Sequence, residues 1–340
     1  MISTDIGEDD QRNYNFEHIP LKIKKVTSIT ILLKLMLKTP FFGLPKDSII
    51  HGHRPDFMLP FTIFCRKNPK VCTLHGIPEI NIKKRKNVMI WRIYTFIEKY
   101  SLSHIDKLIA VNRSAKEYYS KKKRNLDDKT VVIPVGIDSK RFKPLDKEKI
   151  REKYGFKQEE TIILYIGRFS IEKDLELLLK AFKALRSEIP KARLILLGKG
   201  PEEERLKKIV KTQHIDGVTF MKPVKHEDVP KIINCTDVLT LCSLFEGMPT
   251  VVLEALACGV PVVSTDVGDV NKVVVDGKTG QLVRQRTPES LKNAILKVVR
   301  NGGVSYSDSC IAIAKRYSWD NISKEIMEVY AEVEGERTVK

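Results

Sequence analysis

Long hydrophobic runs are missing from this sequence. No uncharged apolar stretch approaches the roughly 18 residues that a membrane-spanning helix needs. The longest candidate, Val26–Leu37, is interrupted by Lys34. The first ten residues carry four acidic side chains, Asp5, Glu8, Asp9 and Asp10, whereas a secretory signal opens with basic residues. These observations argue against an integral membrane protein and leave a peripheral one open.

Paired cysteines and several common catalytic patterns are also missing. The six cysteines are scattered, with neither Cys-x-x-Cys nor a spacing typical of disulfide frameworks or zinc sites. No Asp-x-Asp occurs, and we find no signature of a nucleophilic triad. Gly277-Lys-Thr279 resembles the end of a P-loop, but position 272 is Lys rather than Gly. We expect reduced thiols, no metal and a cytoplasmic protein, either free or peripheral on the cytoplasmic face of a membrane.

Charge is distributed unevenly along the 340 residues. The net charge is +17, of which residues 1–150 carry +14 and residues 151–340 only +3. Such a basic half fits an anionic partner, which could be a membrane surface, a nucleic acid or a phosphorylated acceptor, or else a solvated face. Apolar residues make up 42% of the chain, enough for a real core, and the length favours two domains.

Short apolar runs alternate with amphipathic segments in the second half. Several of these runs end in glycine, as buried parallel strands often do. Expected strands are 161–166, 192–197, 218–221, 237–241 and 261–264, and expected helices are 175–185, 201 onward, 249–258 and 287 onward. This alternation predicts a doubly wound α/β domain whose ligands bind at the carboxyl ends of the strands.

The first half shows the same pattern less completely. Its expected strands are 48–51, 70–74, 107–111 and 130–133, with helices near 28–38 and 89–104. The segment 29–37 could be an interfacial helix at a membrane or a core helix. Residues 141–146 predict a linker between the two domains.

Two glutamates flank a turn at the start of a predicted helix. Glu246 precedes the turn and Glu254 lies inside the helix, eight positions later. The free N–H groups at a helix start can hold a phosphate, and a carboxylate in the helix can accept hydrogen bonds from a ribose diol. A helix with an ordinary acidic start is the simpler alternative for this pair alone.

Cationic side chains follow the strand 161–166. Arg168 comes directly after Gly167, and Lys173 lies five positions later. Such a pair can clamp a diphosphate, although surface ion pairs would use the same residues. In the first half, His75 ends the strand 70–74 and could be either structural or functional.

In the order in which they occur along the chain, the motifs resemble those of glycosyltransferase family 4, from about Asp47 to Tyr330. Members of this family are retaining enzymes that use nucleotide sugars and have the GT-B fold. The matching segments are Thr73–Gly76, Pro134–Asp138 with Phe142 and Pro144, Gly167-Arg168 with Lys173, Gly198–Pro201, Glu246-x7-Glu254, Gly259–Val263 and Val274–Gly280.

The resemblance implies a role for each candidate residue. Arg168 and Lys173, beside Gly167 and Gly198, would neutralise the leaving diphosphate without a metal. Glu254 would hold the nucleotide ribose and Glu246 the donor sugar, while His75 would lie across the cleft near the reacting sugar. Backbone groups of the turn Gly247, Met248, Pro249 and Thr250 would face the phosphate and the sugar, although Pro249 has no N–H to donate.

The start of the chain departs from the family pattern. Relatives begin with a strand and a Gly-Gly loop, whereas Gly7 and Gly43 are the only glycines here before Gly52. Because the first strand of a doubly wound domain is central, its loss would open a gap in the N-terminal sheet, unless the start of the chain is misplaced or residues 1–47 substitute for it. The resemblance then implies a truncated acceptor-side domain over 1–145, a nucleotide-sugar domain over 146–315, and a C-terminal helix over 316–340 that crosses back to the first domain.

The sequence therefore predicts a metal-independent retaining glycosyltransferase that needs no cofactor. Its partners would be a nucleotide-sugar donor, a glycan or lipid-linked acceptor and an anionic membrane surface, with no specific nucleic acid. The alternatives are a catalytically impaired fragment that binds nucleotide sugars and a sugar-nucleotide epimerase of the same fold. Nucleic-acid binding through the basic half lacks a recognition motif.

Overall fold

The computed structural model describes residues 28–338 except 46, 76–87, 123 and 303. It divides the chain into two compact units, residues 1–134 with 319–340 and residues 135–318. The boundary after Pro134 comes earlier than the expected linker 141–146, which lies inside the second unit. Gly76, the last residue of the Thr73–Gly76 motif, falls outside the described residues.

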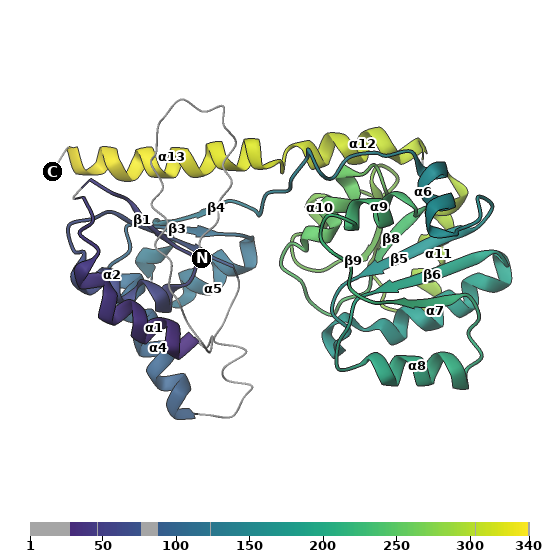
Figure 1. Ribbon diagram of the computed structural model, residues 1–340, viewed down its shortest axis with the longest axis horizontal. Coiled ribbons are helices and arrows are strands. Elements are labelled where there is room, and N and C mark those ends of the chain that lie inside the picture. Colours follow the sequence, from purple (N-terminus) through teal and green to yellow (C-terminus); the bar gives the residue numbers. More distant parts are fainter. Residues whose placement is uncertain (1–27, 46, 76–87, 123, 303, 339–340) are drawn as a thin grey trace. The chain divides into compact units, whose positions relative to one another are not determined.

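The first unit contains a parallel sheet with the order β1-β2-β3-β4 (Figure 1). Its strands are β1 (Ile50–Gly52), β2 (Lys70–Leu74), β3 (Lys107–Ala110) and β4 (Thr130–Val132). Its helices are α1 (Ser28–Lys38), α2 (Leu59–Phe64), α4 (Val88–Ser103), α5 (Arg113–Lys122) and α13 (Trp319–Thr338).

Alternate residues of each strand in this sheet enter different cores, because successive side chains of a strand point to opposite faces. Cys72 and Leu108 pack with Leu102 and Tyr119 on the face covered by α4 and α5. Val71 and Ile109 pack on the other face with a set of residues from α13, namely Ile322, Met327, Val329, Tyr330 and Val333. The C-terminal helix thus completes the first unit, with α13 on one side of the sheet and the other helices opposite (Figure 1).

The gap expected in this sheet is not observed among the described strands. These four strands pair in their sequence order, and β1 forms one edge. The four strands form one continuous parallel ladder, with no unpaired position between any two of them.

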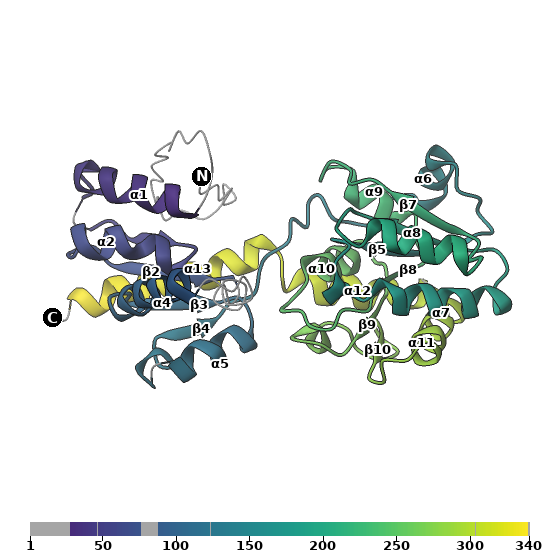
Figure 2. The ribbon, with the colours of Figure 1, turned by 90° about the horizontal axis from the view of Figure 1, so that it is seen from below.

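The second unit contains a six-stranded parallel sheet with the order β10-β9-β8-β5-β6-β7. Its strands are β5 (Thr161–Ile166), β6 (Ala192–Leu197), β7 (Val218–Met221), β8 (Val238–Leu241), β9 (Val262–Thr265) and β10 (Gly280–Val283). Its helices are α6 (Lys147–Tyr154), α7 (Leu175–Glu188), α8 (Glu203–Thr212), α9 (Val229–Asn234), α10 (Thr250–Ala257), α11 (Pro288–Arg300) and α12 (Val304–Lys315). Helices cover both faces of this sheet (Figures 1 and 2), which confirms the predicted doubly wound α/β class.

The strand order places a topological switch point between β5 and β8. From β5 the chain adds β6 and β7 on one side, then returns to add β8, β9 and β10 on the other. In open α/β sheets the loops at such a point diverge and leave a crevice at the carboxyl ends of the strands. The two central strands of the unit therefore determine where a ligand is expected.

Candidate active site

The loops that follow β5 and β8 meet at the switch point. Lys173, in the loop after β5, donates to Oε1 of Glu246, in the loop after β8, over 2.5 Å. Both side chains are largely buried, with 22% and 12% of their surfaces exposed. The structure thus brings together two of the residues that the sequence singled out, one cationic and one acidic.

Several contacts hold the β5 loop against the end of β8. The Cys242 thiol donates to the carbonyl oxygens of Lys173 and Asp174, and the Leu244 N–H donates to the Glu172 carbonyl over 2.8 Å. Asp174 also binds Arg286, whose guanidinium donates to the carbonyl of Ser243 over 2.6 Å. These contacts preorganise the backbone on which Lys173 sits.

Glu246 has a second partner that the sequence did not indicate. The Ser243 hydroxyl donates to Oε1 of Glu246 over 2.6 Å, from three positions earlier in the same loop. Oε1 therefore accepts from both Ser243 and Lys173, which keeps the carboxylate in one orientation. A hydroxyl three residues before an acidic side chain is too common a pattern to be recognised without the fold.

Arg168 lies at the end of β5, where its side chain is exposed. Its carbonyl oxygen accepts a hydrogen bond from the buried Tyr165 hydroxyl over 3.0 Å. This contact fixes the backbone of Arg168 and leaves its guanidinium facing solvent. An exposed guanidinium next to the switch point is available to an anionic ligand.

The glycines after β5 and β6 allow a close approach of two strand ends. Gly198 follows β6, and a Cβ atom on it would lie 1.9 Å from the carbonyl oxygen of Gly167. The Gly167 N–H donates to the carbonyl of Leu197 over 3.0 Å. Both glycines thus shape the backbone at the carboxyl edge and have no side chain of their own to offer a ligand.

The turn before α10 lies where the sequence placed it. Gly247, Met248 and Pro249 lead into the helix, which begins at Thr250, and Pro249 has the extended conformation of an N-cap residue. The Gly247 carbonyl accepts from the Asp269 N–H over 2.9 Å. The first N–H groups of α10 need a partner from outside the helix, as at any helix start.

Glu254 lies within α10, with 13% of its side chain exposed. Its Oε1 lies 3.6 Å from Nε2 of His226, in the loop that follows β7. Burial raises the pKa of the Glu254 carboxyl, and the neighbouring His226 opposes this shift. His226 follows the carboxyl end of β7. Its contact therefore places Glu254 at the same edge of the sheet as Lys173 and Glu246.

His75 belongs to the first unit and is part of a histidine cluster there. Its Nε2 lies 2.8 Å from Nδ1 of His53, and the rings of His53 and His51 are stacked. His51 contacts the Tyr330 hydroxyl over 2.5 Å and the Thr73 hydroxyl over 2.8 Å. Burial and the other two histidines lower the pKa of His51 to about 3, so its ring is neutral near pH 7. Of these three histidines the sequence singled out His75, and the structure joins it to His53 and His51.

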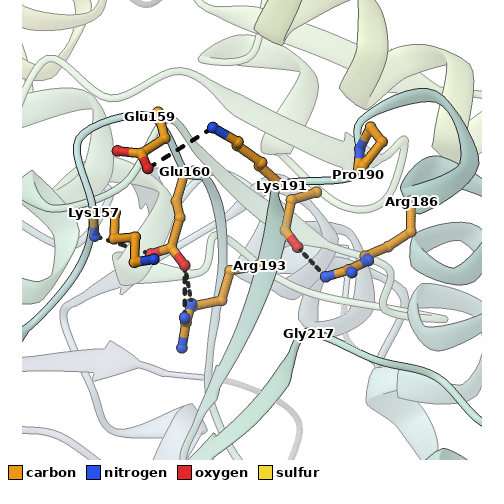
Figure 3. Close-up of a pocket in the computed structure, with 9 residues that line it drawn as sticks. Lys157, Glu159, Glu160, Arg186, Pro190, Lys191, Arg193 and Gly217 are labelled. Carbon is orange, nitrogen blue, oxygen red and sulfur yellow. Dashed lines mark hydrogen bonds and ion pairs between the residues drawn. The ribbon is translucent and has the colours of Figure 1, made fainter.

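A cavity of about 180 Å³ lies at the opposite edge of the second sheet (Figure 3). Glu160, Lys191 and Gly217, which line it, each directly precede a strand. Both arginines that line it have protein partners, since Arg193 donates to Glu160 over 2.6 Å and Arg186 donates to the Ala192 carbonyl over 2.9 Å. This cavity is therefore separate from the candidate site at the carboxyl edge.

Comparison with known families identifies this chain's relatives. The model of the family described as "Glycosyl transferases group 1" matches residues 146–317, which is half of the chain. The chain belongs to this family. A second model, described as "Glycosyltransferase Family 4", matches residues 10–141 of the chain.

Individual relatives are distant. The D-inositol 3-phosphate glycosyltransferase of Mycobacteroides abscessus is 28% identical over 206 residues, covering 58% of this chain and 45% of the relative. The family 4 chain spans about half the length of such curated relatives.

Solved structures show the same GT-B fold. The sucrose-phosphate synthase of Thermosynechococcus elongatus has a TM-score of 0.71 at 23% identity, covering 89% of this chain and 78% of that one. HepE of Anabaena, in complex with UDP-glucose, has a TM-score of 0.71 at 18% identity, with 88% and 82% covered. At such low identity the likeness establishes the fold of this family 4 protein and nothing further.

Proposed function

We propose that this protein transfers a sugar from a nucleotide diphosphate donor to an acceptor with retention of the anomeric configuration. The observation that carries the proposal is the contact between Lys173 and Glu246 at the switch point of the second sheet. At the carboxyl edge, the cation can bind a charged phosphate, and the carboxylate beside it can accept hydrogen bonds from the hydroxyls of a neutral sugar. The names of the relatives, glycosyltransferases among them, support this proposal.

The diphosphate is the part of the donor that gains charge as the sugar leaves. Arg168 and Lys173 follow β5 and supply two positive charges, and the first amides of α10 at Thr250 add a helix N-terminus. Preorganised charges of this kind stabilise a leaving group without rearranging during the reaction. With these two cations at the diphosphate, the proposed reaction would not need a metal ion.

The remaining residues are proposed to recognise the sugars of the donor. Glu254 would accept hydrogen bonds from the ribose hydroxyls, and Glu246 would accept them from the transferred sugar. The backbone of Gly247 and Met248 would contact the phosphate and sugar between these two carboxylates. His75 is a proposed catalytic residue on the family resemblance. The acceptor would be a glycan or a lipid-linked sugar.

Incubation with UDP-, GDP- and ADP-sugars tests this proposal. We expect one donor to raise the melting temperature of the protein and to release nucleoside diphosphate slowly by hydrolysis. Proton NMR of the freed or transferred sugar would show the same anomeric configuration as the donor. Free nucleotide together with an epimerised sugar would indicate an epimerase, and binding without turnover would indicate an inactive nucleotide-sugar binder.

An exposed apolar surface on the first unit suggests where an acceptor-bearing membrane would bind. On α4, Met89, Ile93 and Phe96 lie on one side of the helix and are 70%, 54% and 72% exposed. On α1, Leu33 and Leu37 are 57% and 73% exposed. The two helices lie on either side of α2, which contacts both of them (Figure 2).

Basic residues accompany this apolar surface. Lys34 and Lys38 lie on α1, and Arg92 and Lys99 lie on α4 among the exposed apolar side chains. Apolar contact combined with positive charge is the combination that binds anionic lipid surfaces. We therefore infer that this surface docks on an anionic membrane. No helix among the described residues is both long and apolar enough to cross a membrane.

Vesicle flotation tests the membrane surface. We expect the wild type to float with vesicles containing phosphatidylglycerol far more than with neutral phosphatidylcholine vesicles. Replacing Met89 and Phe96 together by Asp should reduce binding at least about tenfold, because two exposed apolar side chains that would enter the lipid boundary are lost. Ile171→Asp, at an equally exposed apolar residue of the second unit, is the control. Equal flotation of all three proteins would refute the assignment of this surface.

A further inference from the structure

His226 connects Glu254 to the segment that enters the second unit. Its Nδ1 lies 2.8 Å from the Arg141 guanidinium, and its Nε2 lies 3.6 Å from Oε1 of Glu254. The three side chains come from a segment before α6, the loop after β7 and helix α10. They form a chain of polar contacts that the sequence did not indicate.

The contact with Arg141 determines which nitrogen of His226 carries the proton. A guanidinium has only donors, so Nδ1 of His226 must be the acceptor. A neutral imidazole that accepts at Nδ1 carries its hydrogen on Nε2, the nitrogen that faces Glu254. The imidazole is thus set to present an N–H to this carboxylate.

Packing also limits how the imidazole can turn. The ring of His226 meets the buried Phe142 ring edge to face, with centroids 5.5 Å apart and an interplanar angle of 66°. Arg141 is itself held near Asp138, with Nε 3.5 Å from Oδ2. Although 60% of the His226 side chain is exposed, both of its nitrogens therefore have a defined direction.

The Glu254 carboxylate retains free acceptor positions beside His226. Two carboxylate oxygens offer about four lone-pair directions, and a ribose diol uses two of them. We infer that His226, oriented by Arg141, is a positioning residue that holds the Glu254 carboxylate for the two hydroxyls of a nucleotide ribose. This inference rests on the proposed function and adds the residues that prepare its ribose contact.

Two substitutions of His226 separate its N–H from its packing. Phe keeps an aromatic ring against Phe142 but removes the donor, whereas Gln places an amide N–H near the position of Nε2. Calorimetry with UDP, GDP and ADP first identifies the nucleotide that binds the wild type. That nucleotide and its 2′-deoxy analogue are then titrated into the wild type, His226→Phe and His226→Gln.

We expect His226→Phe to weaken binding of the ribonucleotide about tenfold, because Glu254 loses the N–H that orients it towards the ribose. Binding of the 2′-deoxy analogue should change less, so the preference for the ribonucleotide falls. His226→Gln should restore most of that preference. His104→Phe, at an exposed histidine of the first unit, should bind as the wild type does.

Three outcomes would overturn the inference. Unchanged affinity of His226→Phe would show that the imidazole does not act on Glu254. Equal losses for both nucleotides would indicate a general structural defect rather than a positioned ribose contact. Failure of the wild type to bind any of the three nucleotides would remove the proposed function itself, and this inference with it.

Discussion

Replacing Lys173 by Met is expected to lower turnover of the nucleotide sugar by about a hundredfold to a thousandfold. This is the range observed when one preorganised group that stabilises developing charge is removed. Lys173 is well suited to that role, because its ammonium is fixed by Glu246 and its backbone by the Cys242 thiol. Release of nucleoside diphosphate under saturating donor measures the effect.

Lys180→Met is the matched control for this substitution. Lys180 lies on α7, close in sequence, and pairs with Glu176 one helical turn away over 2.8 Å. Thermal unfolding of both variants separates turnover from stability, since loss of Lys173 also deprives the partly buried Glu246 of its cation. If Lys173→Met retained the turnover of Lys180→Met, the cation would have no part in the chemistry.

The arrangement of the second unit could be predicted from its sequence because parallel strands have a strong local signature. The run 161–166 ends at Gly167 and is observed as β5, Thr161–Ile166. The predicted helix 249–258 is observed as α10, Thr250–Ala257. Buried strands and glycine-terminated helices are recognisable from short windows.

Strand β10 and helix α6 are among the elements of the second unit that escaped prediction, because long-range contacts stabilise them. Strand β10 has only four residues, one of them Gln281. Helix α6 is almost wholly polar, yet its Arg151 is buried and donates to Asp237 over 2.8 Å. Asp237 in turn accepts from the Ile162 N–H at the start of β5. Residues so far apart in sequence cannot be paired without the fold.

The dependence on long-range contacts also explains which residues of the candidate site could be predicted from the sequence. Residues that follow central strands, such as Arg168 and Glu246, could be placed at the carboxyl edge from strand order alone. The side chains that contact the predicted site residues could not be placed in this way. His226 and His53 each lie near a predicted residue only because elements from different parts of the chain converge. Ser243 lies in the same loop as Glu246, but its spacing is too common to indicate a contact.

The affinity of Glu254→Gln for a nucleoside diphosphate tests the central claim most directly. Gln has nearly the shape of Glu but lacks its charge, so the variant removes charge-assisted hydrogen bonds while keeping the fold of α10. Glu289→Gln, at an exposed residue in the first turn of α11, is the control.

Isothermal titration calorimetry should show that Glu254→Gln binds the nucleotide about tenfold to a hundredfold more weakly than the wild type, the range for hydrogen bonds to a charged group. The control should bind as the wild type does. Equal affinity of Glu254→Gln and the wild type would contradict the claim that a nucleotide-sugar donor binds at the carboxyl edge of the second sheet.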